Sequence, residues 1–386
     1  MEFKTYVNIK YSQSDVADAK ERLLAAVDEA AAQGEESRER LTAVRAALKN
    51  SGNSHFAGRY GLEEGITFAD SEIIIAVERN RDAVKYLLYR YDFKYYPHRR
   101  KLRRFPLVVA VEASSLCNLR CGMCFQGNMD LQETRQNRGI MEYGVYEKFL
   151  FELEKNSLYS IVFASRGEPL LNPNIDRMIS EAKKRGVLDI KLNTNAVLLT
   201  EELSRRLLAS GLDMIVFSVD SVDSETYRRI RGADLNAVKH NIDRFLRIRI
   251  EEFPKSGITT RVAMVMTKQM LPYAHQEVEA AKQYWLNRVD ELSVKTENDF
   301  AAVYDEDVEV PEKQACSLLW ERVYLWHDGR INPCDIDHLS TMCVGDITKG
   351  DTIEDVWRGE KLERLREIHV KHRQHCSGVC GRCVGY

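Results

Sequence analysis

The sequence has no long apolar run and no excess of either charge. Among its 386 residues, no segment approaches the roughly 18 uncharged apolar residues that a membrane-spanning helix needs, and its first residues contain no apolar signal core. The 56 Lys and Arg residues against 59 Asp and Glu residues give a net charge of −3, so there is no broad basic surface for general nucleic-acid binding. We therefore expect a cytoplasmic protein with no membrane or nucleic-acid partner.

Internal repeats and low-complexity tracts are also missing. The composition, with 44% hydrophobic and 30% charged residues, is that of a globular protein rather than a disordered or fibrous one. The chain is too long for one small domain. We expect three units: a mostly helical region over residues 1–104, a central unit over 105–300 and a small C-terminal unit over 301–386.

The first hundred residues contain no Cys and have the pattern of helices. Amphipathic stretches that begin at Asp15 and Ser37, and a third around Val84, predict three helices. A basic stretch, His98–Arg104, follows them. We interpret it as a solvated linker, and the alternative is an anion-binding edge for a phosphorylated substrate.

In the central unit, short β-branched runs alternate with amphipathic stretches. The predicted strands are Leu107–Val111, Ser160–Phe163, Asp189–Leu192, Met214–Val219, Thr260–Val265 and Glu291–Val294. The predicted helices are Val145–Glu154, Ile175–Arg185, Glu201–Ser210, Ala237–Arg249 and His275–Leu286. This alternation predicts an α/β fold, a partial (β/α)6 TIM-like barrel, with its active site after the carboxyl ends of the strands.

Nine Cys residues stand in close groups, which is unlike a small disulfide-stapled secreted domain. In a reducing compartment, clustered thiols more often bind metal. Cys117, Cys121 and Cys124 directly follow the first predicted barrel strand. Three thiolates can hold three irons of a [4Fe–4S] cluster and leave the fourth iron open, whereas a structural zinc site takes four protein ligands.

This CxxxCxxC spacing after a first barrel strand resembles the signature of the radical S-adenosylmethionine (SAM) superfamily. The resemblance implies that the amine and carboxylate of SAM chelate the open iron. It also implies that an electron from the cluster cleaves SAM to methionine and a 5′-deoxyadenosyl radical, and that flavodoxin or ferredoxin supplies this electron. A zinc site in the loop is the alternative.

Other segments between residues 107 and 295 resemble the same superfamily. Ser165–Pro169 is similar to its GGEP segment, with Arg166 in place of the first Gly. Asn193–Asn195 is similar to a TNG segment, and Ser218 with Arg231 to an SxD…R pattern. By this resemblance, the residues that contact SAM are Met123, Gly167, Glu168, Asn195, Ser218 and Arg231.

A second set of Cys residues lies near the C-terminus. Cys316 and Cys334 bracket a predicted hairpin, and Cys380 with Cys383 forms a CxxC. This arrangement resembles the auxiliary-cluster extension of radical SAM enzymes. The longer version, SPASM, needs a Cx2Cx5Cx3C block that is absent here. By resemblance to the shorter version, twitch, these four Cys hold one auxiliary [4Fe–4S] cluster, and a structural zinc is the alternative.

Two Cys residues remain. Cys376 either replaces Cys380 as a ligand or is simply buried. Cys343 is either a core thiol or a hydrogen-atom donor that faces the substrate, which would make it catalytic.

These features predict a radical SAM enzyme that abstracts a hydrogen from a small molecule such as a sugar, an aminocyclitol or a sugar nucleotide. Oxidation (dehydrogenation) is expected, with the auxiliary cluster as electron acceptor, and epimerisation is the other outcome. One alternative is a maturase of a ribosomal peptide, which would carry a winged-helix domain with strands before helices. A non-catalytic iron–sulfur or zinc module is a third hypothesis.

Overall fold

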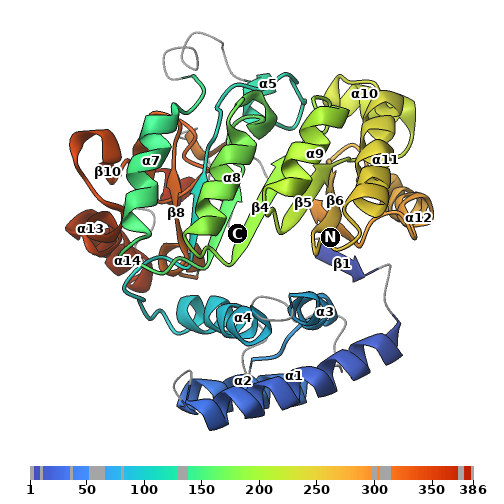
Figure 1. Ribbon diagram of the computed structural model, residues 1–386. Helices are drawn as coiled ribbons and strands as arrows, with labels where there is room; N and C mark the ends of the chain where they lie inside the picture. The colour runs from blue at the N-terminus through green and yellow to red at the C-terminus, as the bar shows by residue number, and fades with distance from the viewer. Residues whose placement is uncertain are drawn as a thin grey trace.

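A computed structural model gives the structure of the chain (Figure 1), and it describes residues 4–8, 12–34, 38–51, 66–79, 82–128, 138–297, 302–304, 314–372 and 378–383. In these residues the strands form one sheet in the order β1-β7-β6-β5-β4-β3-β2-β8-β9-β10. The sheet therefore runs through every part of the chain, from the N-terminal strand to the C-terminal hairpin.

The central strands confirm the predicted partial barrel. They are β2 (Val108–Val111), β3 (Ser160–Phe163), β4 (Asp189–Thr194), β5 (Met214–Ser218), β6 (Thr259–Met266) and β7 (Glu291–Thr296). Each pairs in parallel with the next. The helices between them are α5 (Phe125–Asn128), α7 (Tyr143–Glu152), α8 (Ile175–Lys184), α9 (Glu201–Ala209), α10 (Ser224–Arg231), α11 (Leu235–Glu252) and α12 (Ala274–Trp285).

Alternate residues along the strands point to opposite faces of the sheet and pack in two different hydrophobic cores. On β5, Ile215 and Phe217 belong to the core shared with the surrounding helices, whereas Met214 and Val216 pack with the N-terminal helices. This two-residue period is the one expected of a strand that is covered on both faces. The N-terminal helices therefore share a hydrophobic core with the inner face of the barrel.

The N-terminal region begins with a strand that the sequence did not predict. β1 (Lys4–Asn8) pairs antiparallel with β7 and extends the barrel sheet. The helices that follow are α1 (Gln13–Gln33), α2 (Arg38–Asn50), α3 (Asp70–Glu78) and α4 (Ala83–His98). The first helix begins two residues before the predicted start at Asp15, because Ser12 is the N-cap and Asp15 completes its capping box.

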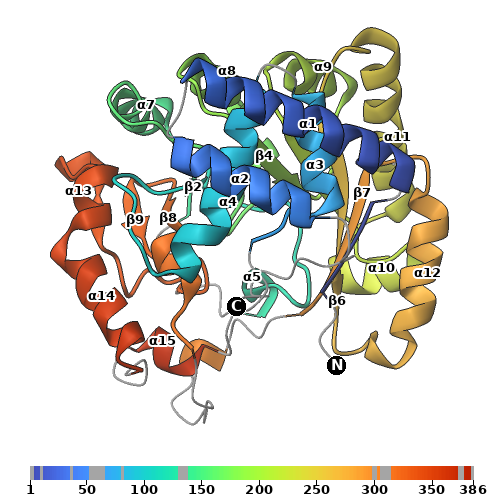
Figure 2. The same cartoon turned by 90° about the horizontal axis from the view of Figure 1, so that it is seen from below.

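α1–α4 lie across the end of the barrel opposite to α5, as the two views show (Figures 1 and 2). Arg79, after α3, donates to the Asp189 carboxylate on β4 at 2.6 Å. Within the helices, Glu72 is buried and forms ion pairs with Arg90 at 2.7 Å and Lys94 at 2.6 Å. Charged and apolar contacts thus fix these helices to the amino ends of the strands.

Part of the basic stretch His98–Arg104 has structural partners. The Arg103 guanidinium lies 4.2 Å from the Tyr159 ring centre, and its carbonyl accepts a hydrogen bond from Trp357. Arg104 forms an ion pair with Glu354 at 2.7 Å. These contacts join the segment to the barrel and to the C-terminal helices and favour its interpretation as a linker.

The C-terminal unit contains the predicted hairpin, β8 (Arg322–Leu325) and β9 (Arg330–Asn332), followed by β10 (Gly345–Asp346). β8 pairs in parallel with β2, so this unit continues the barrel sheet. The helices are α13 (Ile353–Arg358), α14 (Glu360–Val370) and α15 (Val379–Arg382). Gly359 ends α13 and begins α14, so these are two separate helices.

A search for membrane spans among the described residues finds no helix with the length and apolarity to cross a bilayer.

Candidate functional site

Three thiols lie on the loop between β2 and α5, at the carboxyl end of the barrel strands (Figure 1). We call Cys117, Cys121 and Cys124 the first cysteine group. Burial raises the pKa of all three thiols, and the neighbouring thiols contribute to this rise for Cys117 and Cys121; the pKa of Cys121 is raised to about 11. The loop is held to α10 by a hydrogen bond from the Gly122 amide to the Ile230 carbonyl at 3.0 Å. The structure thus gathers the three thiols on one anchored loop.

Gly167 lies directly against the backbone that leads into this loop. A Cβ atom at this position would stand 2.3 Å from the Ser114 carbonyl oxygen and 2.4 Å from the Leu116 carbonyl oxygen. The next residue, Glu168, donates from its amide to the same Leu116 oxygen at 2.8 Å. Only glycine permits this close approach between the loop after β3 and the cysteine loop.

Glu168 is buried, and burial raises the pKa of its carboxyl group. Its side chain accepts hydrogen bonds from the Thr194 hydroxyl at 2.7 Å and from the amides of Asn195 at 2.8 Å and Leu170 at 3.1 Å. The Asn195 side-chain amide in turn donates to the Cys117 sulfur at 4.0 Å and to the Asn118 side chain at 2.8 Å. Glu168 and Asn195 therefore stand at the first cysteine group, from β3 and β4 respectively.

Arg231 approaches the same group from the end of α10. The Cys121 thiol donates to its carbonyl oxygen at 4.0 Å. Its guanidinium is buried and donates to the Asp220 carboxylate at 2.6 Å. Burial acts to lower the pKa of Arg231, but Asp220 raises it overall, so the guanidinium stays protonated. Of the other two predicted SAM contacts, Ser218 ends β5 and Met123 lies in the cysteine loop, both half-buried.

Four further thiols, which we call the second cysteine group, gather in the C-terminal unit: Cys316, Cys334, Cys380 and Cys383. Burial, with smaller contributions from Cys380 and Cys383, raises the pKa of Cys316 to about 12. Burial also raises the pKa of Cys334, with further contributions from Cys316 and Cys380. The four predicted ligands therefore interact with one another, although they come from three separate segments. Cys376 lies outside the described residues.

Cys343 bonds a backbone group and not another thiol. Its thiol is half-buried and donates to the Gly345 carbonyl oxygen at 3.2 Å. The neighbouring Val344 amide donates to Ile331 of β9 at 2.9 Å, so the residue belongs to the edge of the hairpin. The structure gives its thiol a local structural partner.

The donor chemistry of both groups suits iron–sulfur clusters, which are held by thiolates. The first group supplies three thiols, one fewer than a closed cluster needs, and the second supplies four. Among the described residues, no three His, Cys, Asp or Glu side chains are arranged to hold a single metal ion.

Sequence reasoning missed a buried polar network beside the first cysteine group. Arg166 donates to Glu112 through Nε at 2.6 Å and Nη2 at 2.7 Å, and its guanidinium lies 3.4 Å from the Trp326 ring centre. His327 Nδ1 lies 2.9 Å from the same carboxylate. Burial acts to raise the pKa of Glu112, but these two partners lower it overall, so the carboxylate stays ionised. The sequence signal for this network was Glu112, an acidic residue that directly follows the apolar strand β2.

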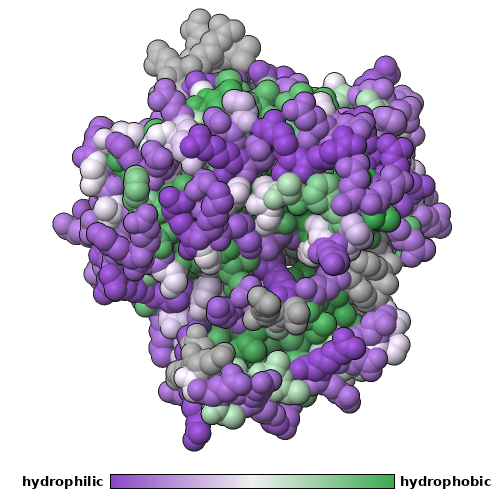
Figure 3. Space-filling model, in the orientation of Figure 1, coloured by the Kyte–Doolittle hydropathy of each residue, from purple (hydrophilic) through white to green (hydrophobic). Residues whose placement is uncertain are grey.

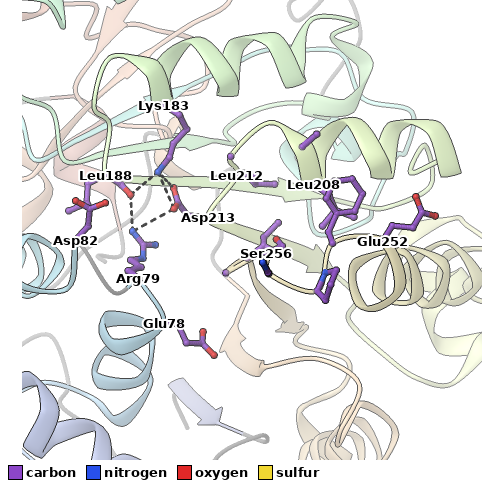
Figure 4. Close-up of a pocket in the computed structure, with 17 residues that line it drawn as sticks. Glu78, Arg79, Asp82, Lys183, Leu188, Leu208, Leu212, Asp213, Glu252 and Ser256 are labelled. Atoms are coloured by element: carbon purple, nitrogen blue, oxygen red, sulfur yellow. Dashed lines mark hydrogen bonds and ion pairs between the residues drawn. The ribbon is translucent and has the colours of Figure 1, made fainter.

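A pocket of about 640 Å³ lies elsewhere, between the N-terminal helices and the amino ends of the strands (Figures 3 and 4). Three of its charged residues interact with each other: Lys183 bonds Asp213 at 2.9 Å, and Arg79 stands 3.8 Å from the same carboxylate. It lies at the end of the barrel opposite to the first cysteine group, so we do not assign it to the active site.

Comparison with known families matches both halves of the site. A radical SAM superfamily model matches residues 111–269, and the SPASM model, described as an iron–sulfur cluster-binding domain, matches residues 316–384. The chain is 28% identical over 277 residues to the tungsten-containing aldehyde ferredoxin oxidoreductase cofactor-modifying protein of Pyrococcus furiosus. This alignment covers 69% of this chain and 73% of that protein. Matches to several GTP 3′,8-cyclases span less than half of their length.

Two solved structures share the fold. BtrN in complex with AdoMet and 2-DOIA aligns with a TM-score of 0.51 and 18% identity, over 72% of this chain and 92% of that chain. The protein anSMEcpe with bound AdoMet and Cp18Cys peptide aligns with a TM-score of 0.52 and 17% identity, over 72% of this chain and 89% of that chain. With the cysteine loop at the carboxyl ends of the strands and the two family matches in sequence, the chain belongs to the radical SAM superfamily and carries a C-terminal SPASM iron–sulfur domain.

Proposed function

We propose that this protein is a radical SAM enzyme that dehydrogenates an alcohol carbon of a small molecule such as a sugar or aminocyclitol. One observation carries the proposal: a loop with three thiols follows β2, and a separate group of four thiols lies in the C-terminal unit, whose hairpin continues the same sheet. Three ligands leave a cluster open to SAM, and four close a cluster that can only exchange electrons.

In this proposal the first cysteine group holds the [4Fe–4S] cluster that binds SAM. Glu168, fixed by three hydrogen bonds, receives the methionine amine, and Arg231 receives the carboxylate. Gly167 and Asn195 hold the rim of the site against the cysteine loop. Met123 and Ser218 are assigned to the adenine and the ribose. An external carrier, flavodoxin or ferredoxin, delivers the electron.

The second cysteine group holds one auxiliary cluster in this proposal. With both clusters bound, they supply one electron to the sulfonium of SAM and accept one from the substrate radical. With SAM bound, this chemistry would remove the hydrogen atom from the substrate carbon, a base would take the hydroxyl proton, and a C=O bond would form. One SAM is consumed for each two-electron oxidation.

The position of Cys343 favours oxidation over epimerisation. Epimerisation needs an S–H group that faces the substrate, whereas this thiol donates to Gly345 at the edge of the hairpin. We test this with Cys343→Ala and candidate substrates deuterated at the reacting carbon. We expect deuterium in 5′-deoxyadenosine, an oxidised product and near-normal turnover in the variant. Solvent deuterium at an inverted carbon, lost with turnover in the variant, would contradict oxidation.

A peptide substrate is the second candidate, since anSMEcpe with a bound peptide shares the fold. In the described N-terminal residues a strand, β1, does precede the helices, but it pairs with β7 and extends the barrel sheet instead of forming the sheet of a separate peptide-binding domain. Deuterium transfer from a labelled peptide, with none from small alcohols, would establish this alternative.

A further inference from the structure

A single histidine joins the two cysteine groups. His338 is 3% exposed and lies four residues after Cys334, in the segment that leads from the second group toward the barrel. Its ring stacks on Phe125, with ring centres 4.4 Å apart and planes at 18°. Phe125 directly follows Cys124 of the first group. The ring contact therefore spans the boundary between the barrel and the C-terminal unit.

On its other side, the same ring is connected to a thiol of the second group. His338 Nδ1 lies 3.1 Å from the Ile336 carbonyl oxygen. A carbonyl can only accept, so Nδ1 carries the proton and donates. The Ile336 amide donates to the Cys334 sulfur at 3.4 Å. The ring Nδ1 of His338, at 3.1 Å, and its backbone amide, at 2.8 Å, thus both donate to the carbonyl of Ile336, the residue whose N–H group points at this sulfur.

Other contacts fix His338 in place. Its carbonyl accepts a hydrogen bond from Arg166 Nη1 at 3.1 Å. Its ring also meets the edge of the Tyr304 ring, with centres 4.8 Å apart. Burial lowers the pKa of His338 to about 4, so the ring is neutral at pH 7 and keeps a single proton, on Nδ1. The residue is held from four sides.

We propose that His338 is a positioning residue that docks the second cysteine group on the first cysteine loop and fixes Ile336, whose N–H group donates to the Cys334 sulfur. Hydrogen bonds to ligand sulfurs raise the reduction potential of an iron–sulfur cluster, because they stabilise the added negative charge. His338 therefore tunes the auxiliary cluster without touching it. This consequence for the potential rests on the proposed function, whereas the docking contact does not.

The test compares three variants in the full, anaerobically reconstituted chain. His338→Ala removes the stack and the Nδ1 donor, His338→Phe keeps only an aromatic ring, and His338→Asn keeps a donor close to Nδ1. His240→Ala is the matched control, because His240 is exposed on α11, outside this network. Iron content is measured first in the unchanged protein, so that failure of the cluster assignment is recognised separately.

Two readouts then follow, neither of which is activity. Hydrogen exchange of the Ile336 amide should be about tenfold faster in the Ala and Phe variants and near normal in the Asn variant. EPR-monitored titration should show the auxiliary cluster about tenfold harder to reduce in the same two variants, which is a shift of about 59 mV for one electron. The His240→Ala control should change neither.

Loss of the auxiliary irons in the Ala variant, with retention in the Asn variant, would also support the proposal. Equal exchange rates and equal potentials in all variants would overturn it. Loss of the irons in both the Asn and the Ala variants would overturn it too, since the restored donor should hold the ligand. If the unchanged protein binds zinc at the second group, the exchange measurement alone decides whether His338 holds this segment.

Discussion

The close approach of Gly167 to the cysteine loop gives the sharpest structural prediction. In Gly167→Ala, the new Cβ would meet the Ser114 and Leu116 carbonyl oxygens at 2.3 Å and 2.4 Å. Both contacts are with backbone rather than with a flexible side-chain end, so the two loops have to separate. Overpacking of this kind costs about 3 kcal/mol. Loss of the hydrogen bond from Glu168 to Leu116 adds about 1 kcal/mol, for a total of about 4 kcal/mol.

The assay is urea unfolding of the full chain, together with SAM binding by the reconstituted protein. Gly144→Ala is the matched control, because a Cβ there meets nothing within 4 Å and the residue lies exposed in α7. That control should be stabilised by up to about 1 kcal/mol, from helix propensity. We expect Gly167→Ala to lose stability and bind SAM more weakly. Equal stability of the two variants, with unchanged SAM binding, would refute the argument from close approach.

Two other predictions concern separate parts of the chain. Replacing Cys316 and Cys334 together by Ala should remove about four irons and preserve SAM cleavage without substrate oxidation, since the open cluster is on the other loop; zinc at this site in the unchanged protein would contradict it. Glu72→Gln should destabilise the protein by about 3 kcal/mol at pH 7. Burial raises the pKa of Glu72, but Lys94 and Arg90 lower it overall from 4.5 to about 2, so this stability is present above pH 4.5 and lost as the pH falls toward 2. If the urea midpoints of the unchanged protein and Glu72→Gln differ by the same amount at pH 7 and at pH 2, the ion pairs of Glu72 do not stabilise the protein in this way.

Local patterns made the barrel predictable. The strands and most of the helices of the central unit lie within a few residues of the predicted ranges, because each buried run is set by its own sequence. The cysteine loop was equally visible, since its three Cys residues are separated by only three and two residues. Its position at the carboxyl end of β2 follows from the rule for parallel sheets.

Long-range pairing was not predictable in the same way. β1 and β7 are neighbours in the sheet, although the other barrel strands lie between them in the sequence. Nothing in the sequence of Lys4–Asn8 identifies β7 as its partner. β8 joins β2 by the same kind of contact. Arg166 was recognised only as a departure from a glycine, whereas its partners lie 54 residues earlier, at Glu112, and 172 residues later, at His338. Such a network depends on the finished fold.

Formation of 5′-deoxyadenosine tests the central claim most directly. The reconstituted protein, with about eight irons, is given SAM and dithionite, beside a variant in which all three Cys of the first cysteine group are replaced by Ala. We expect 5′-deoxyadenosine and methionine from the unchanged protein, and neither from the variant, which should still hold about four irons. Full SAM cleavage by the variant, or none by the unchanged protein with both clusters in place, would contradict the assignment of this loop as the SAM site.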